Sequence, residues 1–256
     1  MTVGLRSLDG QVVDCRACPR LVGWRERVAQ EKRRSFADEE YWGRPVPGFG
    51  PADAAVLVVG LAPAAHGANR TGRMFTGDRS GDWLYAAMHR AGLASQPLST
   101  DRNDGLQLYR ARVTAAVHCV PPDNKPTTLE RDACAQWLQR EVELLRPTLR
   151  VLVGLGSFAW GSTLTAVAAA GWIVPRPRPR FGHGEQVDLE GPPGLTEVTG
   201  LTGLTGLTGL TVLASYHPSQ QNTFTGRLTR PMLDEVFQRA ADLAGVGREG
   251  PASSRR

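Results

Sequence analysis

Short apolar runs alternate along the chain with longer segments in which apolar residues recur every three or four positions. Runs of this kind are typical of strands buried on both faces, and the longer segments are typical of amphipathic helices. The apolar runs lie at 55–59, 112–117, 150–154 and 211–215. The helical segments lie at 19–34, at 80–91, after Thr127, after Gly156-Ser157 and after Thr229.

Helix-start signals support two of these segments. Thr127 and Glu130 have the spacing of a capping box, in which each side chain satisfies a free backbone amide at the helix end. Thr229 is a suitable N-cap, and Pro231 follows in the first turn, where a missing amide breaks no helical hydrogen bond. We therefore expect both helices to begin at these threonines.

The order of the elements predicts the fold class. Strands that alternate with helices pair in parallel through right-handed crossovers. We predict a three-layer α/β/α sandwich with a central four-stranded parallel sheet. A chain of 256 residues, 41% of them apolar, is long enough for one domain of this kind. We expect a single domain over residues 1–245 and a disordered tail over residues 246–256.

Two segments interrupt this pattern. Prolines at alternate positions of 175–180 exclude a regular helix, so we expect an extended basic loop there. A Gly-Leu-Thr repeat that ends at Thr211 lacks proline and has too few triplets for a collagen helix. We interpret this repeat as an expanded loop at about 194–211, inserted ahead of the fourth strand and without a function of its own.

The charge of the chain is compatible with binding to nucleic acid, and its hydropathy predicts no membrane-spanning segment. The net charge is +5, and all basic residues except Lys32 and Lys125 are arginines, which form bidentate contacts to phosphate. Nucleic acid is a suitable partner, although a genome whose codons favour arginine explains the composition equally well. The chain has no apolar run of roughly 18 residues and no apolar block at its start. We expect a cytoplasmic protein without a membrane partner.

Four cysteines suggest a metal centre. Cys15 and Cys18 form a C-x2-C pair, whereas Cys119 and Cys134 lie far downstream. In a protein without an export signal, such thiols favour a metal over disulfides. Their spacing leaves zinc and an iron–sulfur cluster equally open, with scattered buried cysteines as a third reading.

Two loops contain the candidate residues for binding and catalysis. Residues 60–78 follow the first strand, and His217-Pro218-Ser219 follow the fourth. The carboxyl ends of parallel strands are where open α/β sheets bind ligands. Together the two segments resemble motifs of the uracil-DNA glycosylase superfamily. The sequence of residues 69–78 resembles the iron–sulfur branch of this superfamily, family 5 or UDGb. The resemblance extends from about Cys15 to about Ala240.

This resemblance implies an activity and a cofactor. The implied enzyme is a monofunctional glycosylase and a monomer. It hydrolyses the N-glycosidic bond of uracil, and of hypoxanthine or related deaminated bases, in double-stranded DNA and leaves an abasic site. Related iron–sulfur glycosylases carry one C-x2-C pair and two single cysteines, which implies a structural [4Fe–4S] cluster held by Cys15, Cys18, Cys119 and Cys134.

The resemblance also assigns site residues. Phe75 is expected to stack on the extruded base, and His217 to donate a hydrogen bond to O2 of the departing uracil. Better-known branches carry an acidic or amide residue where this chain has Ala62, and family 5 shares that absence. Asp78 is our candidate for orienting water or stabilising the sugar cation, with Asn124 and Asn69 as polar assistants. Asp78 could instead only cap the following helix.

Other polar residues of the loops are candidates for contact with DNA. Arg70 and Arg73 lie in the first loop, and Gln221, Asn222 and Arg227 follow His217. We expect them to contact phosphates or to fill the vacated base stack, although a solvated surface is an equal alternative for each arginine. Lys125 leaves open a lyase that acts through a Schiff base.

Two other functions remain open from the sequence. Ala62 is compatible with a non-catalytic iron–sulfur module that binds nucleic acid. The stretch Gly154–Ala159 fits the relaxed G-x-G-x-x-A form of a dinucleotide-binding loop, but no acidic residue for a ribose lies in 173–180. A dinucleotide-binding enzyme is therefore a weaker hypothesis than a non-catalytic iron–sulfur module.

Overall fold

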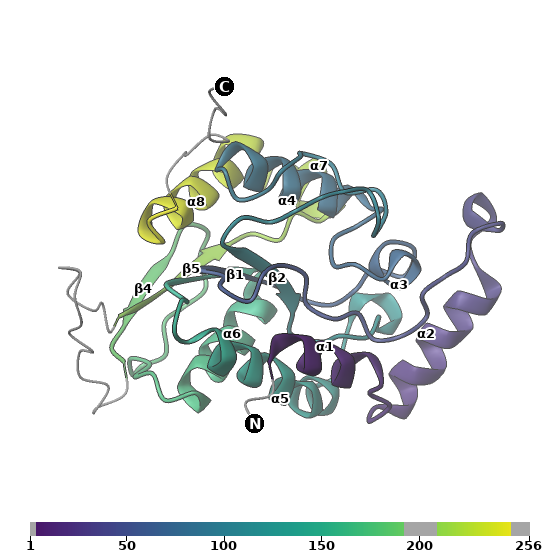
Figure 1. Cartoon of the computed structure of the whole chain (residues 1–256), viewed down its shortest axis with the longest axis horizontal. Helices are drawn as coiled ribbons and strands as arrows, with labels where there is room; N and C mark the ends of the chain where they lie inside the picture. Colours follow the sequence, from purple (N-terminus) through teal and green to yellow (C-terminus); the bar gives the residue numbers. More distant parts are fainter. Residues whose placement is uncertain (1–3, 192–208, 247–256) are drawn as a thin grey trace, which may run out of the picture.

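The computed structural model describes residues 4–191 and 209–246, and its centre is a five-stranded sheet of order β2-β1-β3-β5-β4 (Figure 1). The four predicted strands pair in parallel, as expected. Their bounds are β1 Val56–Gly60, β2 Ala111–Ala115, β3 Val151–Leu155 and β5 Leu210–Ser215.

A fifth strand corrects the predicted four-stranded sheet. Strand β4, Gln186–Leu189, pairs antiparallel with β5 at the edge of the sheet. Only Leu189 of this strand is buried, so it lacks the continuous apolar run that marks a central strand. The sandwich is therefore parallel in its centre and antiparallel at one edge.

Helices cover both faces of the sheet (Figure 1). One layer contains α1 (Leu5–Val13), α5 (Thr128–Leu145) and α6 (Ser157–Ala169), and the other contains α4 (Arg79–Arg90) and α8 (Arg230–Leu243). The capping box at Thr127 and the N-cap at Thr229 are both present, which confirms these predicted helix starts. No helix in the described part of the chain is both long and apolar enough to cross a membrane.

The remaining elements lie beside the sandwich or in its loops. Helix α2 spans Pro19–Glu31, close to its predicted bounds. The sequence did not predict the short helices α3 (Ala68–Thr71) and α7 (Gln220–Phe224), the 3-10 turns η1 (Arg34–Phe36) and η2 (Pro122–Asn124), or α1. The loop helices α3 and α7 have four and five residues, which is too short for a 3.6-residue period to be visible.

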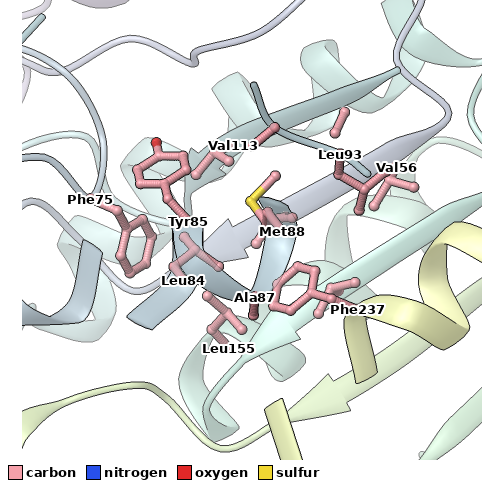
Figure 2. Close-up of a cluster of buried hydrophobic side chains, with 14 of the residues drawn as sticks. Val56, Phe75, Leu84, Tyr85, Ala87, Met88, Leu93, Val113, Leu155 and Phe237 are labelled. Atoms are coloured by element: carbon pink, nitrogen blue, oxygen red, sulfur yellow. The ribbon is translucent and has the colours of Figure 1, made fainter. Parts of the chain in front are cut away.

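Successive residues of each central strand point to opposite helical layers. In β1, Val56 lies in the cluster with Met88 and Phe237 (Figure 2), and Val58 belongs to the same cluster. Leu57 and Val59 belong to the cluster on the other face. Both sets are fully buried. This two-sided burial is the physical reason why the strands read as unbroken apolar runs.

A cluster of charged side chains joins β2 to α5 and α1. Arg112 of β2 is 2% exposed and donates hydrogen bonds to the carboxylates of Glu141 on α5 and Asp9 on α1. A third bond, of 2.9 Å, reaches the carbonyl of Gly50. Every charged group of the cluster therefore has a partner, as burial of charge requires.

The irregular segments are only partly described. Residues 175–180 contain no helix or strand, as predicted, and the Pro179 carbonyl accepts a hydrogen bond from Trp160 at 3.1 Å. Most of the Gly-Leu-Thr repeat and the tail 247–256 lie outside the described residues, so the interpretation of both remains a prediction.

Candidate functional site

A cleft of about 640 Å³ lies at the carboxyl edge of the sheet, where the loops after β1, β2 and β5 meet. We predicted the site at this edge from the sequence. The predicted residues that line the cleft are Ala62, Phe75, Asp78, Asn124, His217 and Gln221.

Two glycines make room for Phe75. A Cβ atom on Gly60, the last residue of β1, would approach the Phe75 ring to 2.7 Å, and one on Gly81 would approach the Phe75 carbonyl oxygen to 1.9 Å. Phe75 itself has a φ of 52°, in the left-handed region that non-glycine residues seldom adopt. The ring lies at the edge of the core cluster near Leu84 and Tyr85 (Figure 2), and its other side borders the cleft.

His217 lies beside Phe75 at the cleft. The two ring centroids are 5.8 Å apart and the rings are tilted by 32°. Burial lowers the pKa of His217 to about 4, so the imidazole is neutral at physiological pH. A neutral imidazole has one N–H donor and one acceptor nitrogen. His217 can therefore donate a hydrogen bond to a group that gains negative charge without bringing a positive charge into the cleft.

Asn222 holds the backbone of His217. Its side-chain amide donates a hydrogen bond of 2.9 Å to the His217 carbonyl, and it does not line the main cleft. This bond makes Asn222 a support for the His217 backbone, and its predicted contact with DNA stays a prediction. The sequence did not reveal this support because α7, which carries Asn222, was not predicted.

Asp78 caps α4 and also lines the cleft. Its carboxylate accepts a hydrogen bond of 3.0 Å from the Gly81 amide. The other oxygen lies against Gly67, where an added Cβ would approach it to 2.1 Å. Burial raises the pKa of Asp78, whereas the hydrogen bonds from the Gly81 and Ser80 amides oppose that rise. Asp78 caps α4 and also lines the cleft, so capping of the helix does not exclude the predicted role in orienting water or stabilising the sugar cation.

The loop after β2 presents Asn124 and Lys125 to the cleft. Asp123 and Asn124 both have left-handed backbones, with φ values of 53° and 55°. Asparagine and aspartate tolerate this conformation better than most residues do. The turn exposes the Asn124 side chain at the cleft, where the sequence placed a polar assistant.

Asn69 is not part of the cleft. The residue is fully buried in α3, and its amide donates a hydrogen bond of 3.3 Å to the Arg25 carbonyl on α2. This placement does not support a contact with the base or with water. Asn69 instead joins the loop after β1 to α2, and we correct its assignment accordingly.

Arg70 and Arg73 belong to the interior of their loop. Arg73 is 4% exposed and pairs with Asp104 at 2.6 Å, and Arg70 pairs with Glu39 while its guanidinium lies 4.0 Å from the Phe36 ring centroid. Contact with DNA phosphates would require breaking these contacts. We therefore correct both assignments: these arginines shape the loop that carries Phe75.

Exposed residues at the rim remain available for DNA. Gln221 lines the cleft, and Arg227 lines an adjoining hollow beside His217 with its guanidinium 4.6 Å from the Tyr216 ring. The structure adds two residues that the sequence analysis missed. Arg79 lines the cleft, and its guanidinium lies 4.3 Å from the ring of Phe224, which is 66% exposed.

All four cysteines line one small cavity beside the sheet. Cys15 follows α1, Cys18 caps α2, Cys119 follows β2 and Cys134 lies on α5. In the described part of the chain, no three His, Cys, Asp or Glu side chains are arranged to hold a metal ion as they stand. The thiols thus share a cavity without closing around a single ion.

The surroundings of these thiols suit an anionic group. Arg25 is 2% exposed and donates a hydrogen bond of 2.9 Å to the sulfur of Cys119, and the His118 amide donates to that of Cys134 at 3.4 Å. Burial raises the pKa of the Cys119 and Cys134 thiols. Thiolates in such a place need nearby positive charge, which a buried arginine and a bound metal would both supply.

The structure is that of an α/β protein with a cleft at the carboxyl edge of its sheet, and comparison with known proteins identifies its family. The model of the uracil DNA glycosylase superfamily matches residues 47–241. The chain therefore belongs to that superfamily.

Relatives that match most of the chain are type-5 uracil-DNA glycosylases. A type-5 uracil-DNA glycosylase of Mycobacterium tuberculosis is 53% identical over 93% of this chain and 81% of that protein. One of Thermus thermophilus is 50% identical over 91% and 94%, and one of Pyrobaculum aerophilum is 43% identical over 92% and 91%. These similarities confirm the resemblance seen in the sequence and do not favour a non-catalytic module or a dinucleotide enzyme.

Proposed function

We propose that this protein excises uracil from double-stranded DNA by hydrolysing the N-glycosidic bond and leaving an abasic site. The observation that carries the proposal is the neighbouring pair of Phe75 and His217 at a cleft of about 640 Å³. An extruded base requires an aromatic surface for stacking and polar groups for its edge. Phe75 supplies the first, and His217 with Asn124 supplies the second.

His217 acts on the leaving group. As the glycosidic bond breaks, negative charge accumulates on O2 of uracil, and the neutral imidazole donates its N–H to that oxygen. This hydrogen bond strengthens as charge develops, so it stabilises the transition state more than the bound substrate. No proton needs to be transferred for this stabilisation.

Asp78 acts on the sugar side. Its carboxylate lies in the loop that leads from Phe75 into α4, where it orients the attacking water or stabilises the sugar cation. Asn124 assists from the opposite loop. Gln221 and Arg227 hold the DNA at the rim, and breadth toward hypoxanthine or other deaminated bases is part of the same proposal.

The variant Asp78→Asn separates catalysis from capping. Asparagine remains a competent N-cap, and it removes a carboxylate whose pKa burial already raises, so we expect thermal stability to be kept. Single-turnover excision should slow by about tenfold, the scale of one lost charge-assisted hydrogen bond.

Asp82→Asn is the matched control, because Asp82 lies in the first turn of the same helix and does not line the cleft. This control should excise at the parent rate. A stable Asp78→Asn protein with an unchanged rate would remove Asp78 from the mechanism and leave Asn124 as the candidate.

We further propose that Cys15, Cys18, Cys119 and Cys134 hold a [4Fe–4S] cluster. Support comes from the shared cavity and from buried Arg25 at the Cys119 sulfur, because four thiolates with such a cluster carry net negative charge. The cluster would join α2, α5 and the segment after β2, and its proposed role is structural.

Purification without oxygen should yield a brown protein with about four iron and four sulfide ions per chain. Cys134→Ser should lower the iron content, whereas Ser95→Ala should leave it unchanged, because Ser95 does not line the cysteine cavity. A colourless protein that contains stoichiometric zinc would contradict the cluster.

A direct assay tests the proposed activity. Matched duplexes that carry one uracil, one hypoxanthine or no lesion are incubated with the protein, and strand breaks are read after alkaline cleavage of abasic sites. Breaks only at the lesions support the proposal; binding without any break would support the non-catalytic module. Borohydride should trap no adduct, and a trapped adduct that Lys125→Ala abolishes would replace water attack by a Schiff base.

The same proposal includes a single domain over residues 1–245 that works as a monomer in the cytoplasm. One sheet with a core cluster on each face is the support for the single domain. Sedimentation of the purified chain would check the monomer.

A further inference from the structure

A second histidine contacts the backbone next to His217. His183 lies in the turn before β4, and its Nδ1 accepts a hydrogen bond of 3.1 Å from the Tyr216 amide. The same turn pairs with β5, because the Gly184 amide donates to the Ala214 carbonyl at 2.9 Å. His183 is thus held at the end of the strand that carries His217.

The ring of His183 also packs on Tyr216. The two ring centroids are 5.1 Å apart and the rings are tilted by only 29°. Arg227 contacts the same tyrosine ring, with 4.6 Å from its guanidinium to the centroid. The side chain that precedes His217 is therefore packed between a neighbouring strand turn and the arginine at the rim.

Two hydrogen bonds hold the backbone on either side of the His217 Cα atom. The amide one residue before His217 donates to His183, and the carbonyl of His217 accepts from Asn222 at 2.9 Å. We propose that His183 is a positioning residue that sets the orientation of His217 through the Tyr216 amide. The proposal rests on the proposed function, because it concerns the action of His217 on the leaving base.

The hydrogen bond requires one tautomer of His183. Nδ1 can accept from an amide only when it carries no hydrogen, so the ring must be neutral with its hydrogen on Nε2. Burial lowers the pKa of His183, which favours the neutral ring, whereas the Met232 backbone and Glu235 oppose that effect. The charged groups nearby are Glu235 and Arg239, which line the same hollow, and Arg227 on Tyr216.

Two polar variants separate this role from simple packing. The Oδ1 atom of asparagine occupies nearly the place of Nδ1 in histidine, whereas the amide of glutamine extends toward the place of Nε2. His183→Gln should slow single-turnover excision by about tenfold, the scale of one lost hydrogen bond, with unchanged affinity for DNA. His183→Asn should recover most of the rate. His183→Phe keeps a ring on Tyr216 without the acceptor and should be as slow as His183→Gln.

A double-mutant cycle with His217→Ala tests whether His183 acts through His217. If it does, His183→Gln should have almost no further effect in the His217→Ala background, because the group that it positions is absent. Additive losses, equal rates of the Asn and Gln variants, or a His183→Gln protein that excises at the parent rate would each overturn the proposal.

The first two proteins of the cycle also test the proposed function. A parent that does not excise uracil, or a His217→Ala protein as fast as the parent, would overturn the proposed function and the inference with it. Failure of the inference alone is recognised by a slow His217→Ala protein combined with any of the three contrary results for His183.

Discussion

We expect His217→Ala to slow single-turnover excision of uracil by roughly a hundredfold or more, the usual loss on removing one donor to a developing anion. The imidazole ring lies 5.8 Å from the Phe75 ring. In the proposed mechanism it stabilises charge that is absent from the bound substrate. Its loss should therefore lower the rate and leave the affinity for DNA nearly unchanged. Single-turnover kinetics and a binding titration on the same duplex measure both quantities.

His89→Ala is the control, because His89 is exposed on α4 and does not line the cleft. It should excise at the parent rate. A His217→Ala protein that binds DNA more weakly but excises uracil from saturated DNA at the parent rate would show that His217 binds the ground state and the transition state equally.

The acid dependence of stability should change in the same variant. Burial lowers the pKa of His217 from 6.5 to about 4, so the unfolded chain binds more protons than the folded chain between these values. Stability therefore falls as pH decreases through this window, and the contribution of His217 to that fall is absent from His217→Ala. The difference in unfolding temperature between parent and variant, followed with pH, measures this contribution.

The second large effect concerns stability. Arg112→Met should destabilise the fold by about 3 to 5 kcal/mol, because it leaves the buried Glu141 carboxylate without its cationic partner. For a domain of this size, we expect the unfolding temperature to fall by roughly 10 °C. Asp9 of α1 loses the same partner, so α1 should exchange its amide hydrogens faster.

Arg90→Met is the matched control. Arg90 of α4 also makes two hydrogen bonds to carboxylate oxygens, both of them on Asp234 of α8, but its side chain is 45% exposed. Exposed pairs contribute about 0 to 1 kcal/mol, so the unfolding temperature should change little. Equal losses in the two variants would show that burial of the Arg112 cluster adds nothing.

Contacts between distant residues explain most of the differences between the expected and the observed site. Arg70 and Arg73 were expected at DNA because they lie in the first loop. Their partners Glu39 and Asp104 lie about thirty residues away on either side of the loop, and no local pattern marks such pairs. Asn69 is similar, because its partner is the Arg25 carbonyl on another helix.

The sequence by itself determined the central strands, the helix starts at Thr127 and Thr229, and the two loops that bring Phe75 and His217 to one edge. These features follow from two-sided burial and from hydrogen bonds within a few residues, both of which local patterns record. Only the tertiary structure decided the edge strand β4, the burial of Arg73 and the contact of His183 with the Tyr216 amide. Each of these depends on contacts between segments that are far apart in the sequence. Such contacts are set by the packing of the whole chain and leave no local pattern.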